Sequence, residues 1–191
     1  MKIAILTSGI LPVPAVQGGA VENLIDFYLE YNEKHKIHHF TVYSVYHPLL
    51  KNKKETSHTS YHHIKNDRSF FIRLKRFIFK KTHRNLYYDS SIEFFLYKAL
   101  QDIKKKEIDA ILLENRPGYA LSIPKTIKAQ LILHLHNDLL NEQTRSSIEM
   151  YNNISNIITV SEYIKKQVDG VNKALPSKSI TVPNGIDLDK F

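Results

Sequence analysis

The 191-residue sequence contains no cysteine and no tryptophan, and it has no apolar run of the roughly 20 residues that a membrane-spanning helix needs. The absence of cysteine excludes disulfide bonds and thiolate metal sites, and it fits a reducing compartment such as the cytoplasm. Any membrane contact is therefore expected to be peripheral. The apolar residues 3–6 are interrupted by Thr7, Ser8 and Gly9, which indicates a buried first strand rather than a signal peptide.

Short apolar runs alternate with helical patterns along the chain, which is typical of a parallel α/β sheet. We expect strands at residues 2–7, 39–45, 60–64, 109–114, 130–136, 156–160 and 179–182. We expect helices at residues 19–34, 70–82, 89–106, 119–126, 138–152 and 162–168. The pattern predicts one Rossmann-like domain, a parallel sheet flanked by helices, with ligands at the carboxyl ends of the strands.

Positive charge is concentrated in one segment. The net charge is +8, and residues 65–84 hold eight Lys and Arg residues against one Asp, a net of +7. On a helix over 70–82, the side facing away from the main apolar arc would carry Ile72, Arg73, Lys75, Arg76, Phe79 and Lys80. Such a face suits an anionic membrane surface, and a solvated basic helix is the alternative. Nucleic-acid binding is not expected, because no recognised module is present.

A glycine pair, Gly18 and Gly19, ends the loop after the first strand and opens the first helix. Backbone without Cβ atoms can approach a diphosphate closely, and the free N–H groups of a helix start favour negative charge. The loop has neither the dinucleotide-binding nor the P-loop spacing, so a loop that needs only conformational freedom is the alternative. Glu22 is expected to favour the helix dipole.

Polar residues end three of the other strands. His134 and His136 share one face of their strand and could ligate a metal, but no third ligand is evident, so no metal site is predicted. We expect His134 to be structural. Arg116 could bind an acceptor phosphate or pair with Glu114 or another acid. Ser161 is well explained as a helix N-cap.

The final residues form a strand that is ended by Pro183 and followed by an Asn184-Gly185 turn. This stretch resembles the V-P-N-G-[IV]-D-x-x-x-F signature of retaining glycosyltransferases of family four (group 1), which have the two-domain GT-B fold. The loop that ends in the glycine pair, the strand that ends at His136 and the Val160-Ser161 step also resemble segments of that family. Glu114-Asn115-Arg116-Pro117 resembles a segment found in its enzymes of surface-polysaccharide assembly.

The resemblance implies that residues 1–183 are the acceptor-binding, N-terminal half of a GT-B fold. Residues 184–191 would begin the linker to a donor-binding domain that the chain lacks. The implied site residues are Gly18 and Gly19 for the donor diphosphate, His136 for the donor sugar, Glu114, Asn115, Arg116 and Ser161 for the acceptor cleft, and Asn184, Gly185 and Asp187 between the domains. Neither a metal nor another cofactor is expected.

The expected function is transfer of a sugar, with retention, from a nucleotide diphosphate sugar to a lipid-linked, surface-polysaccharide or lipopolysaccharide precursor. The enzyme would be cytoplasmic and peripheral at the inner face of the membrane. The 191-residue chain alone is expected to be inactive, because most nucleotide-binding residues of the family lie in the other half. The alternative is a non-catalytic, membrane-associated subunit that needs a separate partner chain. An oxidoreductase domain is disfavoured by the glycine spacing.

Overall fold

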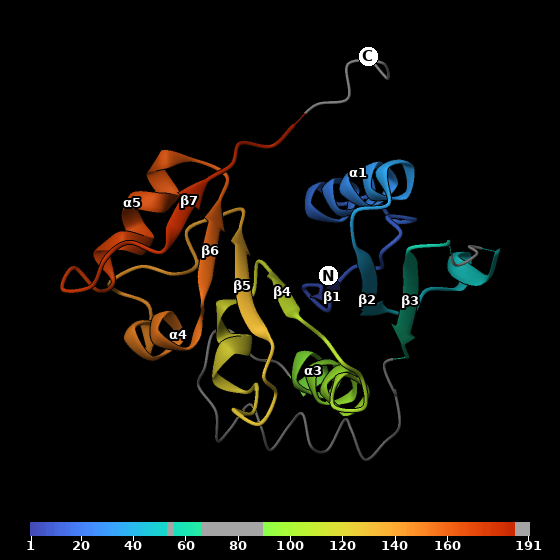
Figure 1. Cartoon of the computed structure of the whole chain (residues 1–191), viewed down its shortest axis with the longest axis horizontal. Coiled ribbons are helices and arrows are strands. Elements are labelled where there is room, and N and C mark those ends of the chain that lie inside the picture. The colour runs from blue at the N-terminus through green and yellow to red at the C-terminus, as the bar shows by residue number, and fades with distance from the viewer. Residues whose placement is uncertain (53–55, 66–89, 186–191) are drawn as a thin grey trace.

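The structure, a computed structural model, describes residues 1–52, 56–65 and 90–185 (Figure 1). Its centre is one seven-stranded sheet with the order β3-β2-β1-β4-β5-β6-β7, and every neighbouring pair is parallel. The strands are β1 (Lys2–Leu6), β2 (His39–Val45), β3 (Thr59–Ile64), β4 (Ala110–Glu114), β5 (Gln130–Leu135), β6 (Asn156–Thr159) and β7 (Ser179–Thr181). The predicted Rossmann-like parallel sheet is confirmed, and each of the seven strands lies where the sequence placed it, within two residues at either end.

Helices cover both faces of this sheet, and Figure 1 shows α1 and α3 on opposite sides of it. Among the described residues the α-helices are α1 (Ala20–His35), α3 (Ser90–Ile103), α4 (Ser147–Asn153) and α5 (Glu162–Gly170). Two short 3-10 helices, η1 (Pro48–Asn52) and η2 (Pro117–Leu121), lie in connections. Helices on both faces bury the sheet between two apolar layers, as a parallel sheet requires.

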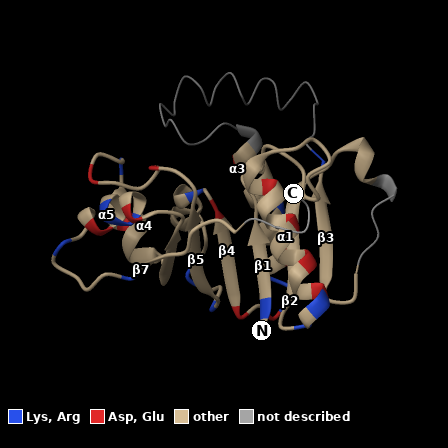
Figure 2. Cartoon of the chain, turned by 90° about the horizontal axis from the view of Figure 1, so that it is seen from above, with Lys and Arg blue, Asp and Glu red and all other residues tan. Residues whose placement is uncertain are grey.

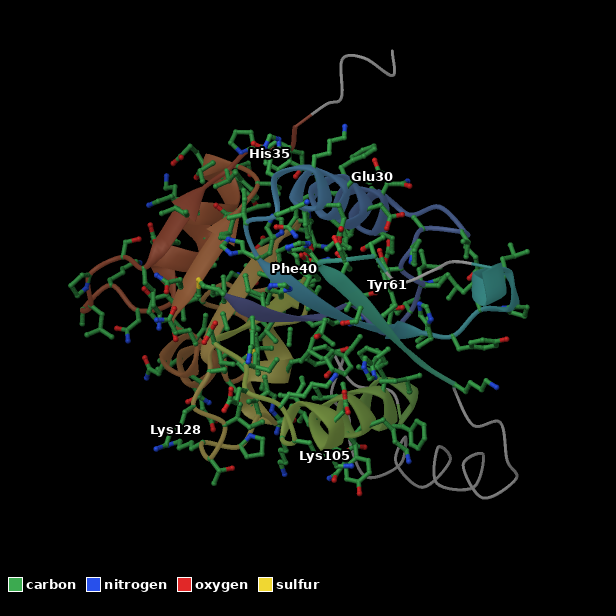
Figure 3. The ribbon with its side chains drawn as sticks, turned by 45° about the vertical axis from the view of Figure 1, so that its right-hand side comes forward. Glu30, His35, Phe40, Tyr61, Lys105 and Lys128 are labelled. Carbon is green, nitrogen blue, oxygen red and sulfur yellow. The ribbon has the colours of Figure 1, made fainter. Side chains whose placement is uncertain are left out.

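Helix α1 forms the first apolar layer. Its apolar residues recur every three or four positions and so share one side of the helix. Ile25 and Leu29 are almost fully buried against Val42 and Phe40 of β2. Figure 3 shows Phe40 on the α1 side of the sheet, whereas Glu30 lies on the exposed side of the helix.

Helix α3 anchors the larger layer on the other face. Phe95 and Ala99 are fully buried there, and η2, α4 and α5 each add side chains to the same cluster. Tyr119 from η2, Tyr151 from α4 and Val168 from α5 have at most 1% of their surface exposed. The sheet is therefore fixed from below by four separate elements and from above by α1.

Two of the predicted helices differ from the structure. Residues 119–126 were expected to be helical, but only the 3-10 turn η2 forms; Pro124 removes a backbone donor and disfavours the helical conformation of the residue before it. Residues 138–146 form turns, and α4 begins only at Ser147. In these turns Asn141 Oδ1 accepts from the Gln143 N–H (2.9 Å), and Thr144 Oγ1 accepts from the Asn141 N–H (3.1 Å). These side chains compete with helical backbone bonding.

The helix expected over 70–82, with its candidate membrane residues Ile72, Arg73, Lys75, Arg76, Phe79 and Lys80, lies outside the described residues. Within the described part of the chain, no helix combines the length and the apolar character needed to cross a bilayer. Figure 2 shows mainly acidic residues along α1, so the charge of that helix is opposite in sign to the excess in residues 65–84.

Phe95→Ala should lower the free energy of unfolding by about 3–5 kcal/mol, because it removes a fully buried ring from the layer beneath the sheet. Tyr97→Ala on the same helix is the matched control. The Tyr97 side chain is 57% exposed, so its loss should change stability by about 0.5 kcal/mol or less. Urea denaturation of both variants measures the difference, and equal losses would contradict this description of α3.

Candidate functional site

A cavity of about 300 Å³ lies at the carboxyl ends of β1, β4 and β5. The chain runs from β1 outward to β3, then returns to the other side of β1 and continues to β7, so the order of the strands reverses between β1 and β4. Ligands of open parallel sheets bind at such a switch point. The lining residues are Ser8, Ile10, Leu11, Val21, Glu22, Asn115, Arg116, Asn137 and Leu139. Polar groups and apolar side chains thus face the same space.

A second, larger cavity of about 620 Å³ lies between residues 138–143 and α5. Charged side chains such as Glu142, Lys166 and Lys173 line it, and none of the residues that the sequence singled out as site residues is among its lining. The cavity at the switch point is therefore the candidate site, since its position and its residues agree with the expected ligand-binding edge.

The glycine pair adjoins this cavity. Gly18 and Gly19 both have positive φ, of 75° and 106°, and Gly19 is the N-cap residue of α1. A Cβ on Gly19 would lie less than 3.0 Å from Glu22 Oε2 and from Leu11 Cδ1, whereas a Cβ on Gly18 would meet nothing within 4 Å. Glu22 and Leu11 therefore leave no room for a side chain at position 19, and glycine is required there whether or not a ligand is bound.

Glu22 has a role that sequence reasoning missed. Its side chain is 95% buried, with 5% exposed, and it lines the cavity beside Gly19. The Ser8 hydroxyl donates to Glu22 Oε1 over a long 3.4 Å. A negative charge at this place favours hydroxyl donors, and it opposes an anion that approaches Gly19 from the cavity. The only sequence signal was the position of Glu22 in the first turn of the helix.

Asn115 and Arg116 reach the cavity from the end of β4. Asn115 adopts the left-handed conformation (φ 55°), and its Oδ1 accepts from the His136 N–H at 3.2 Å. Arg116 Nε donates to the carbonyl of Ser8 at 3.1 Å, and the Tyr119 hydroxyl donates to the same oxygen at 3.2 Å. Arg116 forms no ion pair with Glu114 or with another acid of the described chain. Its guanidinium holds the β1 loop at the cavity wall.

Beneath the cavity, Glu114 is completely buried. The Tyr28 hydroxyl donates to its Oε1 at 2.8 Å, and His134 Nδ1 and His136 Nε2 each lie 3.2 Å from its Oε2. The two imidazole rings are 4.2 Å apart between centroids. The shared face predicted for the two histidines is confirmed, and Glu114 is the third group that the sequence did not reveal. Strand register could have found it, because Glu114 pairs with His134 across β4 and β5.

The surroundings of Glu114 strongly favour its ionised form. Burial opposes ionisation, but hydrogen bonds from His134 and His136 and the positive charge on those rings outweigh it and lower the pKa of Glu114 to about 2. Burial and the neighbouring carboxylate raise the pKa of Tyr28 well above its usual range. The cluster therefore holds a carboxylate ion in the interior, with a neutral phenol as one donor.

The remaining predicted site residues lie elsewhere. Ser161 caps α5, where its Oγ accepts from the Ile164 N–H at 3.3 Å, and it is not among the cavity-lining residues. Asn184 and Gly185 are exposed after β7, and Asp187 lies outside the described residues. The two histidine side chains are 12% and 10% exposed, so burial does not separate a structural His134 from a ligand-binding His136.

Gly19→Ala should destabilise the fold more than Gly18→Ala. Both substitutions place a side chain at positive φ, which costs about 1–3 kcal/mol, but only the Gly19 variant also displaces Glu22 and Leu11. Chemical denaturation of both variants measures the difference. In a Glu22→Ala background the extra cost of Gly19→Ala should shrink, and equal costs at the two glycines would show that the contact has no energetic effect.

Tyr28→Phe should lower stability by about 1.5–3 kcal/mol, because it removes a hydrogen bond to a buried charged group. Tyr31→Phe on the same helix is the control. Tyr31 is 57% exposed, and losing its hydroxyl should change the free energy of unfolding by about 0.5 kcal/mol or less. A Tyr28 variant as stable as the Tyr31 variant would mean that Glu114 does not depend on the phenol.

No family model matches the chain. Over its whole length the chain is 27% identical to spore coat protein SA and 27% identical to the putative glycosyltransferase YtcC, both of Bacillus subtilis (strain 168). The chain spans 44% and 41% of these two proteins, which is less than half of each. The similarity in sequence therefore concerns one part of longer relatives.

Two solved structures share the fold. Anabaena HepE, in a structure with UDP and glucose, matches 99% of this chain with 46% of its own, at a TM-score of 0.56 and 18% identity. The N-terminal domain of Candida albicans trehalose-6-phosphate phosphatase matches 99% of this chain at a TM-score of 0.54 and 13% identity. At such identities the likeness shows fold alone. The chain has the parallel sheet of the N-terminal half of a GT-B fold, as predicted, and it is similar in sequence to a putative glycosyltransferase.

Proposed function

We propose that this chain is the N-terminal half of a GT-B glycosyltransferase that uses a nucleotide diphosphate sugar as donor. The observation that carries the proposal is the cavity at the switch point between β1 and β4, where polar and apolar groups line one space. The sequence similarity to the putative glycosyltransferase YtcC and the fold shared with HepE, which was solved with UDP and glucose, support the same conclusion.

The chemistry of the cavity suits a sugar. Glu22 and the Asn115 and Asn137 amides can bond hydroxyl groups, while Leu11 and Leu139 offer apolar surface to a ring face. Arg116, fixed by its bond to Ser8, places a positive charge at the same wall. Together these groups would position an acceptor hydroxyl, so that the contribution of this half to catalysis is proximity and orientation.

The finer assignments are part of the proposal and follow from the motifs. Residues 1–183 would bind the acceptor, and the chain from Asn184 through Gly185 and Asp187 would lead into a donor-binding domain. Gly18 and Gly19 would face the donor diphosphate and His136 the donor sugar. Since Glu22 lies against Gly19, we expect a diphosphate to approach the glycine backbone from the side opposite this carboxylate. Membership of family four (group 1) and retention at the anomeric carbon are also part of this proposal.

The acceptor and the location of the enzyme rest on sequence motifs. The Glu114-to-Pro117 segment supports a lipid-linked or surface-polysaccharide precursor as acceptor. The +7 segment at residues 65–84 supports a cytoplasmic enzyme held at an anionic inner membrane surface.

The 191-residue chain alone should show no sugar transfer and should bind UDP-glucose only in the millimolar range, about −4 kcal/mol. A longer polypeptide that includes a donor-binding half should release nucleoside diphosphate from at least one nucleotide sugar. Calorimetry on the chain tests the expected weak binding, and a product assay on the longer protein tests the expected release of nucleoside diphosphate. Micromolar binding by the chain would contradict the division of roles, and an inactive longer protein would favour the non-catalytic subunit.

Asn137→Ala in the longer protein should lower turnover at least about tenfold, equivalent to about 1.4 kcal/mol. Asn137 lines the cavity but is exposed, so its truncation should leave the fold intact. Asn152→Ala is the matched control, since Asn152 is exposed on α4 and does not line the cavity. Equal activity of the two variants would show that this cavity is not part of the substrate site.

A further inference from the structure

We propose that Glu114, His134 and His136 bind a divalent transition metal, with Zn²⁺ as the best fit to the donor set. The ligand atoms are Glu114 Oε2, His134 Nδ1 and His136 Nε2, and all three lie within 4.8 Å of one another. One carboxylate oxygen and two imidazole nitrogens are a common zinc ligand set that leaves a fourth position open. The inference rests on this cluster alone and does not depend on the proposed sugar transfer.

Charge balance is the first reason. An ionised carboxylate in the interior needs a compensating positive charge. Glu114 is completely buried, and no lysine or arginine of the described chain pairs with it; its charged partners there are the two histidines. Compensation therefore comes either from protons on the imidazole rings or from a cation held between the three groups. Both rings direct a nitrogen at the same carboxylate oxygen, so one cation could contact all three groups.

The spacing of the donor atoms is the second reason. With bonds of 2.0–2.2 Å, the ligand atoms of a tetrahedral zinc ion are about 3.3 Å apart. The distances from Glu114 Oε2 to His134 Nδ1 and to His136 Nε2 are both 3.2 Å. The backbone fixes this arrangement, because the histidines are two residues apart at the end of β5 and Glu114 is paired with His134 on β4.

The hydrogen bond of Tyr28 is the third reason. Carboxylates that bind metals are usually held by a further hydrogen bond that orients them. The Tyr28 hydroxyl donates to Oε1, at 2.8 Å, and so turns Oε2 toward the two rings. Both histidine side chains keep about a tenth of their surface exposed. Asn115 and Asn137, which adjoin two of the ligands in sequence, line the cavity above and mark a path for an ion.

The experiment is a calorimetric titration of the chelator-stripped protein with ZnSO₄ at pH 7.5. We expect one tightly bound Zn²⁺ for each chain and a higher melting temperature on binding. His134→Ala and His136→Ala should each abolish tight binding. Tyr28→Phe keeps all three ligands and should weaken binding about 10–100-fold through loss of orientation. His39→Ala/His58→Ala removes a stacked histidine pair outside the cluster and should bind like the parent protein.

Circular dichroism shows whether the ligand variants fold. If they do not, the visible spectrum of the Co²⁺-loaded parent protein and X-ray absorption at the zinc edge report the coordination directly, and two imidazoles with one carboxylate are expected. Absence of stoichiometric binding to the parent protein would overturn the proposal and assign the charge balance to a proton. Tight binding that persists in folded His134→Ala or His136→Ala would overturn it as well.

Discussion

An ionised carboxylate without access to water must be satisfied by its neighbours, and at Glu114 this requirement connects three elements of the fold. Tyr28 comes from α1, Glu114 from β4, and the two histidines from β5 and the residue that follows it. Each donor is therefore held at a defined place relative to the other two. This cluster helps to fix the positions of two cavity-lining residues, because Asn115 and Asn137 directly follow Glu114 and His136 in sequence.

The walls of the cavity depend on hydrogen bonds from side chains to the backbone. Asn115 in its left-handed conformation bonds the backbone of His136, and Arg116 and Tyr119 converge on the carbonyl of Ser8. These hydrogen bonds connect the ends of β1, β4 and β5 beyond the last residues that pair in the sheet. A polar site at strand ends can in this way be rigid while remaining open to solvent.

The sequence predicted the regular part of the fold well, for a physical reason. Buried parallel strands appear in the sequence as short apolar runs, and α1 and α3 repeat apolar residues at helical spacing. The pattern of apolar residues was therefore enough to identify these elements. The failures lie where side chains bond the nearby backbone, as at Asn141 and Thr144, or where Pro124 restricts the chain. Local hydrogen bonding of that kind overrides an apolar pattern, and periodicity cannot detect it.

The sequence predicted relations between site residues within one strand, but it did not predict contacts between strands. The sequence placed His134 and His136 on one face, but Glu114 joins them through the pairing of β4 with β5, which depends on strand order. Glu22 shows the same limit, since its contact with Gly19 arises from the turn that starts α1. The glycine pair was interpreted as an approach for a diphosphate, yet the nearest charge at Gly19 is negative. The structure shows a packing need for glycine at this position. Under the proposed diphosphate role, only the side of the backbone turned away from Glu22 suits an anion.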